Sequence, residues 1–426
     1  MSLVASALRI LIVAGVVSGA AVACSAATPP PSLRAGSSAT ADTSASAPAP
    51  ASTATDGRPR WVAGAVPSGF PVSVDSTSTR DSLFAWSRGY VVFRETVDTS
   101  DDDNAGQIAV TPWVSSDGRS WQQGQPLDAA SLWDSTSMAA MVEGPAGLVA
   151  VSRGSFFSDD LSGDVPDAVT GLWTSTDGKS WKRVALESAF GVEALGDVAA
   201  GPLGYIATNL SYAAASVAPA VWLSADGRKW RSVALARGSL AGGHLATGYV
   251  LPGGYLVAGW TVGPADTDAP TDTAGPNGPD TTPAIWSSSD GVSWRESSLP
   301  GVVAAPMKEA AVETIAAGRY IADVGSWSCG CEPIRDDQAW SSTDGFSWQP
   351  APAASFGDVS DGHRGLRLVL KDGVAPLGVE TSPDGLTWSP LAVSGPGPTD
   401  NGSAAYGPAG LMVEATDGWI WLLALG

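Results

Sequence analysis

One nine-residue pattern, Trp-x-Ser-x-Asp-Gly-x-x-Trp, occurs five times in this chain without error. The copies occupy residues 113–121, 173–181, 222–230, 286–294 and 340–348. A sixth copy, 380–388, lacks only the first Trp. Internal repeats of this kind restrict the architecture before any other feature is considered, because each repeat must be one structural unit that packs against its neighbours.

The sequence between the copies is periodic as well. Short apolar segments such as 147–151, 204–208 and 254–258 each follow a turn signal and read as β-strands, and several follow an earlier strand such as 137–143. Each unit therefore contains four strands, A to D, and the nine-residue pattern spans the hairpin between C and D. Since no segment has helical periodicity, we predict an all-β protein built as a β-propeller.

The number of blades follows from counting these units. Six patterns give six blades, and segments 404–406, 410–414 and 419–423 add an incomplete seventh. Residues 61–66 or 71–74 could supply its fourth strand and close the ring. We expect one propeller domain over 61–426 with seven blades, and six blades as the alternative.

The repeated pattern resembles the Asp-box, also called the BNR repeat, of sialidases, sortilin-type receptors, some glycoside hydrolases and the photosystem II assembly factor family. In that family the box is a structural hairpin away from the active site. Its Asp accepts backbone N–H groups across the turn, Ser adds a second anchor and Gly supplies a positive φ. The resemblance therefore implies a structural role for Asp117, Asp177, Asp226, Asp290, Asp344 and Asp384.

The same resemblance makes demands that the chain does not meet. Sialidases hold the substrate carboxylate with three Arg and carry an early Arg-Ile-Pro motif; the nearest segment here is Phe93-Arg94-Glu95-Thr96. Residues Arg153, Arg319, Arg364 and Arg367 have no assignable counterparts. We therefore assign no catalytic residue, and keep a sialidase-like or other glycoside hydrolase as the alternative to a non-catalytic protein.

The N-terminal residues read as an export signal. Arg9 precedes an apolar and small-residue run, 10–23, that ends in Ala21-Val22-Ala23-Cys24. This segment is similar to the bacterial lipobox, which implies removal of residues 1–23 and lipidation of Cys24; an ordinary secreted protein is the alternative. Residues 24–60 are rich in Ala, Ser, Thr and Pro, which predicts a disordered tether. We expect an extracytoplasmic protein anchored to the outer side of the bacterial cell membrane.

The two remaining cysteines, Cys329 and Cys331, lie two residues apart. In an oxidising compartment they could form a local disulfide. Free thiols, or a metal or redox role, are the alternatives, although the chain has only two His to complete a metal site.

The working face is expected opposite the Asp-boxes, because the long insertions 97–109, 155–168, 262–283 and 327–338 are nearly all B–C loops. These loops are acidic. One hypothesis is that Asp101 and Asp103 bind calcium; the alternative is that the acidic loops are simply solvated. Five aromatic residues in or beside the loops could contact a ligand or pack beneath the loops: Trp133, Phe156, Phe157, Trp260 and Trp327.

The formal net charge of −20 argues against nucleic acid as a partner and against an electrostatic grip on a membrane. From these observations we expect a monomeric, membrane-anchored scaffold or binding protein whose ligand is a cell-envelope protein or glycan. A glycoside hydrolase and an assembly factor for a membrane complex are the two alternatives.

Overall fold

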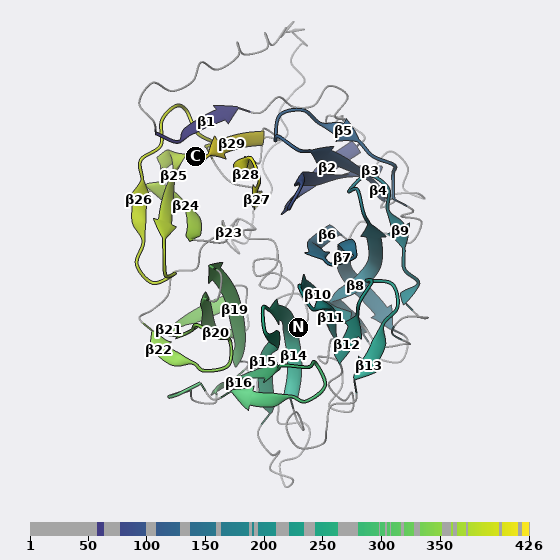
Figure 1. The fold of residues 1–426 in the computed structure, drawn as a ribbon, viewed down its shortest axis with the longest axis vertical. Helices are drawn as coiled ribbons and strands as arrows, with labels where there is room; N and C mark the ends of the chain where they lie inside the picture. Colours follow the sequence, from purple (N-terminus) through teal and green to yellow (C-terminus); the bar gives the residue numbers. More distant parts are fainter. Residues whose placement is uncertain are drawn as a thin grey trace, which may run out of the picture.

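The chain forms a ring of seven small antiparallel sheets, which is a seven-bladed β-propeller (Figure 1). This computed structural model describes residues 58–63, 77–98, 108–127, 137–158, 163–186, 190, 195–209, 221–233, 243–262, 280–297, 299–302, 305–306, 308–316, 319–327, 333–351, 359–360, 364–371, 374–399, 403–415 and 420–425. The all-β class and the seven blades are confirmed, and the six-bladed alternative is wrong.

The strands of each blade follow in chain order from A, the innermost, to D. Blade 1 holds β2 (Thr77–Trp86), β3 (Gly89–Asp98), β4 (Ile108–Ser115) and β5 (Gln122–Gln123). Blade 2 holds β6 (Ser137–Gly144), β7 (Gly147–Ser158), β8 (Gly163–Ser175) and β9 (Lys182–Arg183). Blade 3 holds β10 (Leu195–Gly201), β11 (Gly204–Asn209), β12 (Val221–Ser224) and β13 (Arg231–Val233).

The later blades repeat this order. Blade 4 holds β14 (Gly243–Leu251), β15 (Gly254–Val262), β16 (Asp280–Ser288) and β17 (Arg295–Ser297), with β18 (Ala305–Pro306) also paired to β16. Blade 5 holds β19 (Lys308–Ala316), β20 (Arg319–Trp327), β21 (Pro333–Ser342) and β22 (Gln349–Ala351). Blade 6 holds β23 (Val359–Ser360), β24 (Gly365–Lys371), β25 (Val374–Ser382) and β26 (Ser389–Leu391).

Blade 7 closes the ring by joining the two ends of the chain. It consists of β27 (Ser403–Gly407), β28 (Gly410–Glu414), β29 (Ile420–Ala424) and the N-terminal strand β1 (Arg60–Ala63), which pairs antiparallel with β29. The prediction that the region 61–66 supplies the closing strand is therefore confirmed, while the other candidate, 71–74, lies outside the described residues. Ser394 after blade 6 also bonds to this strand, through Trp61 N (3.0 Å) and Pro59 O (2.9 Å).

The hydrophobic core lies between blades rather than within them. One cluster combines Val91 and Phe93 of blade 1 with Leu148 and Trp173 of blade 2, and another combines blades 7 and 1. Because a B strand is covered by a neighbouring blade on each face, both of its faces are apolar: Tyr90, Val91, Val92 and Phe93 are all fully buried. The short runs that lack alternation in the sequence follow from this arrangement.

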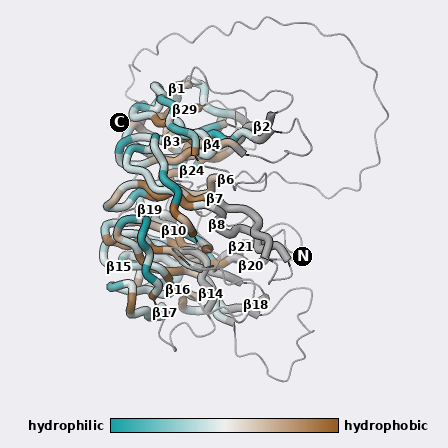
Figure 2. Tube along the Cα trace, turned by 90° about the vertical axis from the view of Figure 1, so that its right-hand side faces the viewer, coloured by the Kyte–Doolittle hydropathy of each residue, from teal (hydrophilic) through white to brown (hydrophobic). Residues whose placement is uncertain are grey.

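The ring has two faces that the antiparallel order defines. The A–B turns and the C–D hairpins lie at one end of the strands, which we call the Asp-box face; the ends of the B strands and the starts of the C strands lie at the other, which we call the B–C face. Since Arg60 pairs with Ala424 at the end of the C strand, the chain enters blade 7 at the Asp-box face. Figure 2 shows the ring from its side, with the C-terminus at the left edge near β1 and β29.

One predicted loop is largely strand. Within the segment 155–168, β7 continues to Ser158 and β8 begins at Gly163, and Phe156 pairs with Val165 and Phe157 with Asp164. Aromatic and β-branched residues favour this pairing, and register shifts near Arg153 and Gly154 accommodate it. The outer strands are shorter than the sequence suggests: β9 has two residues, although Val184 N still bonds Leu172 O at 2.8 Å.

Candidate functional site

The six hairpins that carry the nine-residue pattern, which we call boxes after the family that they resemble, share one hydrogen-bond pattern. In the first box, Asp117 Oδ1 accepts the backbone N–H groups of Arg119 (2.9 Å) and Ser120 (2.7 Å). The Ser115 hydroxyl donates to the same carboxylate (3.0 Å) and accepts the N–H of Gly118 (2.8 Å). The same contacts recur at Asp177, Asp226, Asp290, Asp344 and Asp384.

The glycine of the box is required by both conformation and space. Gly118 has a φ of 71°, and a Cβ built there would lie 2.5 Å from Cε of Met412 in blade 7. The closing Trp also holds the turn where its indole N–H reaches the glycine carbonyl, as Trp181 does to Gly178 at 2.8 Å. Each box therefore fixes its own hairpin and its contact with the preceding blade.

These contacts keep the box carboxylates ionised. For Asp117, burial raises the pKa, but the N–H groups of Ser120 and Arg119 and the Ser115 hydroxyl outweigh it and lower the pKa to about 2. For Asp290, the N–H of Ser293 contributes most to a pKa lowered from its ordinary value. The carboxylates face their own backbone, which is an arrangement for stabilising a turn.

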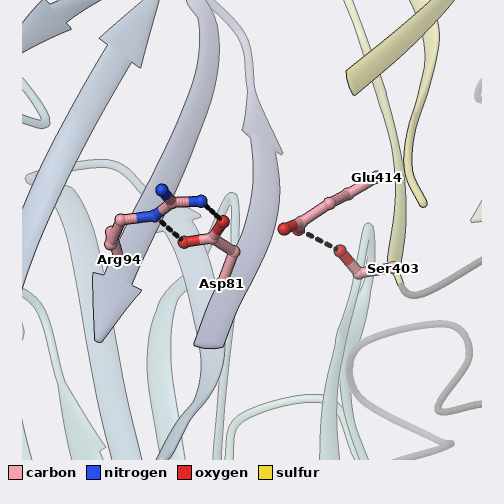
Figure 3. A network of polar contacts seen from close by, with 4 residues as sticks. All are labelled: Asp81, Arg94, Ser403 and Glu414. Carbon is pink, nitrogen blue, oxygen red and sulfur yellow. Dashed lines mark hydrogen bonds and ion pairs between the residues drawn. The ribbon is translucent and has the colours of Figure 1, made fainter. Parts of the chain in front are cut away.

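The interior holds a charged network where blades 1 and 7 meet (Figure 3). Arg94 of β3 forms a two-pronged ion pair with Asp81 of β2, with Nε 2.6 Å from Oδ1, and the two side chains are 7% and 5% exposed. Glu414, at the end of β28, points toward Asp81 and accepts the Ser403 hydroxyl at 3.0 Å. The network therefore connects the first and last blades near the B–C face.

Glu414 has a raised pKa in this network. Burial raises its pKa well above the ordinary value of 4.5; the negative charge of Asp81 and a hydrogen bond to that carboxylate raise the pKa further, against the opposing effect of Arg94. The raised pKa favours the protonated form of Glu414 beside the ion pair of Arg94 and Asp81.

Two more charged side chains of inner strands also have structural contacts. Glu95 is 1% exposed, and its carboxylate accepts the backbone N–H of Met138 in blade 2 at 2.6 Å. In blade 6, Arg367 lies over the ring of Trp388 at 4.6 Å and pairs with Glu380, with Nε 2.6 Å from Oε2. The Phe93-Arg94-Glu95-Thr96 segment, compared above with the Arg-Ile-Pro motif, thus supplies an ion pair within blade 1, through Arg94, and a contact with blade 2, through Glu95.

The predicted binding aromatics do not form one group in the described part of the chain. Trp260, on β15, is 8% exposed and pairs with Pro283 of β16, which fits the packing alternative; its role as a contact residue stays a prediction. Phe156 and Phe157 lie on the paired end of β7, and Trp327 ends β20, paired with Pro333. Trp133 lies outside the described residues.

Several other predicted sites cannot be placed in the fold. Cys24, Asp101, Asp103, Cys329 and Cys331 all lie outside the described residues. Among the residues that are described, no group of three or more His, Cys, Asp or Glu is arranged to hold a metal ion. Within the same residues, no helix has the length and apolar character needed to cross a membrane.

Sequence reasoning missed the network of Asp81, Arg94 and Glu414. The available signal was a charged residue next to an apolar run: Arg94 directly follows the buried segment 90–93, and Glu414 follows the buried segment 411–413. Their partners could not be identified, because Glu414 and Asp81 lie at opposite ends of the chain and meet only when the ring closes.

No model of a known protein family matches the sequence, and no curated protein matches it. Among solved structures, the chain is similar to the α-L-arabinanase of Penicillium chrysogenum, with 12% identity, a TM-score of 0.35, and 78% of this chain and 96% of that chain covered. It is also similar to the Aleuria aurantia lectin, with 14% identity, a TM-score of 0.36, and 75% and 95% covered. These are propellers of glycoside hydrolase and lectin type. At such low identities and TM-scores, the likeness indicates nothing about ligand or activity.

Proposed function

We propose that the chain is a lipid-anchored, extracytoplasmic propeller that binds a cell-envelope protein or glycan at its B–C face without catalysing a reaction. The observation that supports this proposal is the use of the buried charges. Asp81, Arg94, Glu95 and Glu414 each contact another blade or each other. These contacts hold the ring together, and they occupy the groups that a catalytic centre on the inner strands would need.

The arginines give a second argument for this proposal. A sialidase holds the substrate carboxylate with three convergent guanidinium groups. Among the residues whose exposure the structure describes, Arg94 is the buried arginine, and it forms an ion pair with Asp81. Arg367 forms an ion pair with Glu380 in blade 6.

A glycoside hydrolase is the second candidate, because Asp81 and Glu414 are paired carboxyl groups of which one has a raised pKa. Glycosidases separate their two carboxyl groups by about 5–9.5 Å, so that the sugar or a water fits between them. Asp81 is instead engaged by Arg94, and Glu414 accepts the Ser403 hydroxyl and is 7% exposed. This geometry favours the structural role.

The experiment that tests the binding proposal is a comparison on an array of bacterial envelope glycans and purified envelope proteins, with the full chain. The double substitution Phe156→Ala/Phe157→Ala alters the B–C end of β7, and Lys182→Ala/Arg183→Ala alters the outer strand of the same blade. We expect the first variant to lose binding and the second to keep it. Equal binding by the first variant and the unaltered chain would contradict a ligand site at this part of the B–C face.

Turnover of a glycoside would decide for the second candidate if it depended on the carboxyl pair. Asp81→Asn and Glu414→Gln keep hydrogen-bonding groups at both positions while removing the acids. Loss of turnover in both folded variants would refute the non-catalytic proposal.

A further inference from the structure

At the position after the box glycine, the Asp-box face carries basic residues in blades 1 to 3 and apolar residues in blades 4 to 6, while Arg319 and Arg364 also lie at this end of blades 5 and 6. We call the side formed by blades 1 to 3 the basic half. The residue that follows the box glycine is Arg119, Lys179 and Arg228 in blades 1 to 3. The equivalent residue in blades 4 to 6 is Val292, Phe346 and Leu386. The hydrogen bonds of the box do not use these side chains, so the hairpin itself does not account for the division.

The basic half is continuous across three blades. Arg88 in the A–B turn of blade 1 donates to Thr176 O in blade 2, and Lys179 of blade 2 donates to Gln122 of blade 1. Arg228 of blade 3 reaches back to the Thr174 hydroxyl of blade 2 at 3.0 Å. The basic side chains therefore lie side by side along the rim of this face.

The charge of this half is opposite to that of the whole chain. Five basic residues lie on its turns, Arg88, Arg119, Lys179, Arg228 and Lys229, and the adjoining outer strands add Lys182, Arg183 and Arg231. The described acidic residues of the same turns are the three box aspartates and Glu143. The aspartates face their own backbone, and Glu143 accepts Ser87 Oγ at 2.6 Å. A local positive surface thus exists on a chain of net charge −20.

The exposed apolar side chains belong to the same face. Among the described residues, the large hydrophobic side chains classed as exposed are Leu203 (46%) and Val292 (47%). Leu203 lies in the A–B turn of blade 3 and Val292 in the box of blade 4, and these blades are joined at this end by Tyr255 Oη to Leu203 O at 3.2 Å. Apolar tips beside cationic residues are the composition of surfaces that rest in a membrane interface.

The tether joins the propeller at this face as well. Arg60 pairs with Ala424 at the end of the C strand of blade 7, and Arg58, just before it, is exposed. The chain N-terminal to this point, which includes Cys24, therefore departs from the Asp-box face. A lipid anchor at Cys24 would keep this face within reach of the membrane, and contact of the face with the lipid would then fix an orientation that the tether alone does not.

We propose that the Asp-box face is a docking surface for an anionic phospholipid membrane, with blades 1 to 3 contacting the headgroups and Leu203 and Val292 entering the interface. This inference extends the proposed membrane attachment: it orients the propeller so that its B–C face is presented to ligands. Basic groups near an anionic leaflet attract it strongly, and the attraction weakens with salt.

The test measures partition of the full chain carrying Cys24→Ser onto vesicles, so that no acyl chain contributes. The vesicles contain phosphatidylcholine with or without phosphatidylglycerol, and the readout is the ratio of the two affinities. We expect a preference for the anionic vesicles that falls with salt. Arg119→Glu/Lys179→Glu/Arg228→Glu should reduce that preference roughly 100-fold. The matched control Arg119→Lys/Lys179→Arg/Arg228→Lys retains the charges and should retain the preference.

Two outcomes would overturn the proposal: no preference of the unaltered chain for anionic vesicles, or the same preference in the glutamate variant. Binding of the unaltered chain to soluble polyphosphate but not to vesicles would also overturn it, and would indicate an acidic polymer as the partner. A second variant, Leu203→Gln/Val292→Gln, should lower the part of the binding that resists salt. Because this chain carries no lipid and the assay contains no ligand, a failure here leaves the proposed ligand binding standing.

Discussion

Replacing Glu414 by Gln should change how the stability of the propeller depends on pH. Burial and the charge of Asp81 raise the pKa of Glu414 well above 4.5. The folded protein therefore keeps a proton that the unfolded chain releases above pH 4.5. The contribution of this group is most favourable below 4.5, and it is lost as the pH rises through the native pKa.

The size of the effect follows from the linkage of one proton. Between the unfolded and the native pKa, each pH unit lowers the free energy of unfolding by about 1.4 kcal/mol. This slope applies from pH 4.5 up to the raised native pKa, and this one group accounts for it. Gln keeps an acceptor for the Ser403 hydroxyl but has no proton to release, so this part of the slope should disappear.

The assay is denaturant unfolding of the full chain, followed by tryptophan fluorescence at several pH values. Three proteins are compared: the unaltered chain, Glu414→Gln, and Glu296→Gln on the exposed strand β17. We expect the Glu414→Gln curve to be flatter than the other two and to lie above them at the alkaline end. Parallel pH profiles for all three proteins would refute the assignment of a proton to Glu414.

Three further predictions concern a hydrogen bond between blades, a box hairpin and a buried tryptophan. Tyr90→Phe removes a buried hydroxyl that donates to Gly410 O at 2.6 Å, and should lower the free energy of unfolding by about 1–3 kcal/mol; in denaturant titrations the loss should exceed that of Tyr255→Phe, whose bond is 3.2 Å long. Asp117→Asn should weaken the acid dependence of stability. Although burial raises the pKa of Asp117, its hydrogen bonds lower it to about 2. Its contribution is therefore present above 3.8 and lost as the pH falls through about 2. Thermal unfolding at several acidic pH values would show this, and an unchanged acid profile would contradict it. Trp260→Ala should destabilise the folded chain by about 3–5 kcal/mol without a specific loss of ligand binding; loss of binding in a variant of unchanged stability would return Trp260 to the ligand site.

The architecture could be predicted because six of the seven blades contain the same short hairpin pattern. The box places Ser, Asp and Gly at fixed positions in one hairpin, and these residues act within three positions of one another, as Ser115 and Asp117 do. Because these residues are close in sequence, the pattern can be recognised without knowledge of the structure. The closing strand 60–63 was predictable for another reason: the count of strands left the last blade one strand short.

The charged network between blades 1 and 7, and the distribution of basic residues on the Asp-box face, could not be predicted in the same way. Asp81, Arg94 and Glu414 meet across the closure of the ring, so their pairing depends on the number of blades and on the register of β1 with β29. The difference between blades 1 to 3 and blades 4 to 6 on the Asp-box face appears only when the same position is compared in six hairpins. That comparison becomes meaningful once the structure shows that all six hairpins lie at one end of the ring. The burial of Trp260 could not be predicted either, because an aromatic residue beside a long insertion has the same sequence pattern whether it is buried or exposed.

The measurement that tests the non-catalytic account most directly is turnover of a fluorogenic sialoside by the purified, folded full chain, with and without calcium. The account predicts no release of the fluorophore above that of a heat-unfolded sample in either condition. Turnover that persists through repurification, is blocked by a sialidase inhibitor and is abolished in folded Asp81→Asn and Glu414→Gln variants would contradict it. The network at the ring closure would then be a reaction centre.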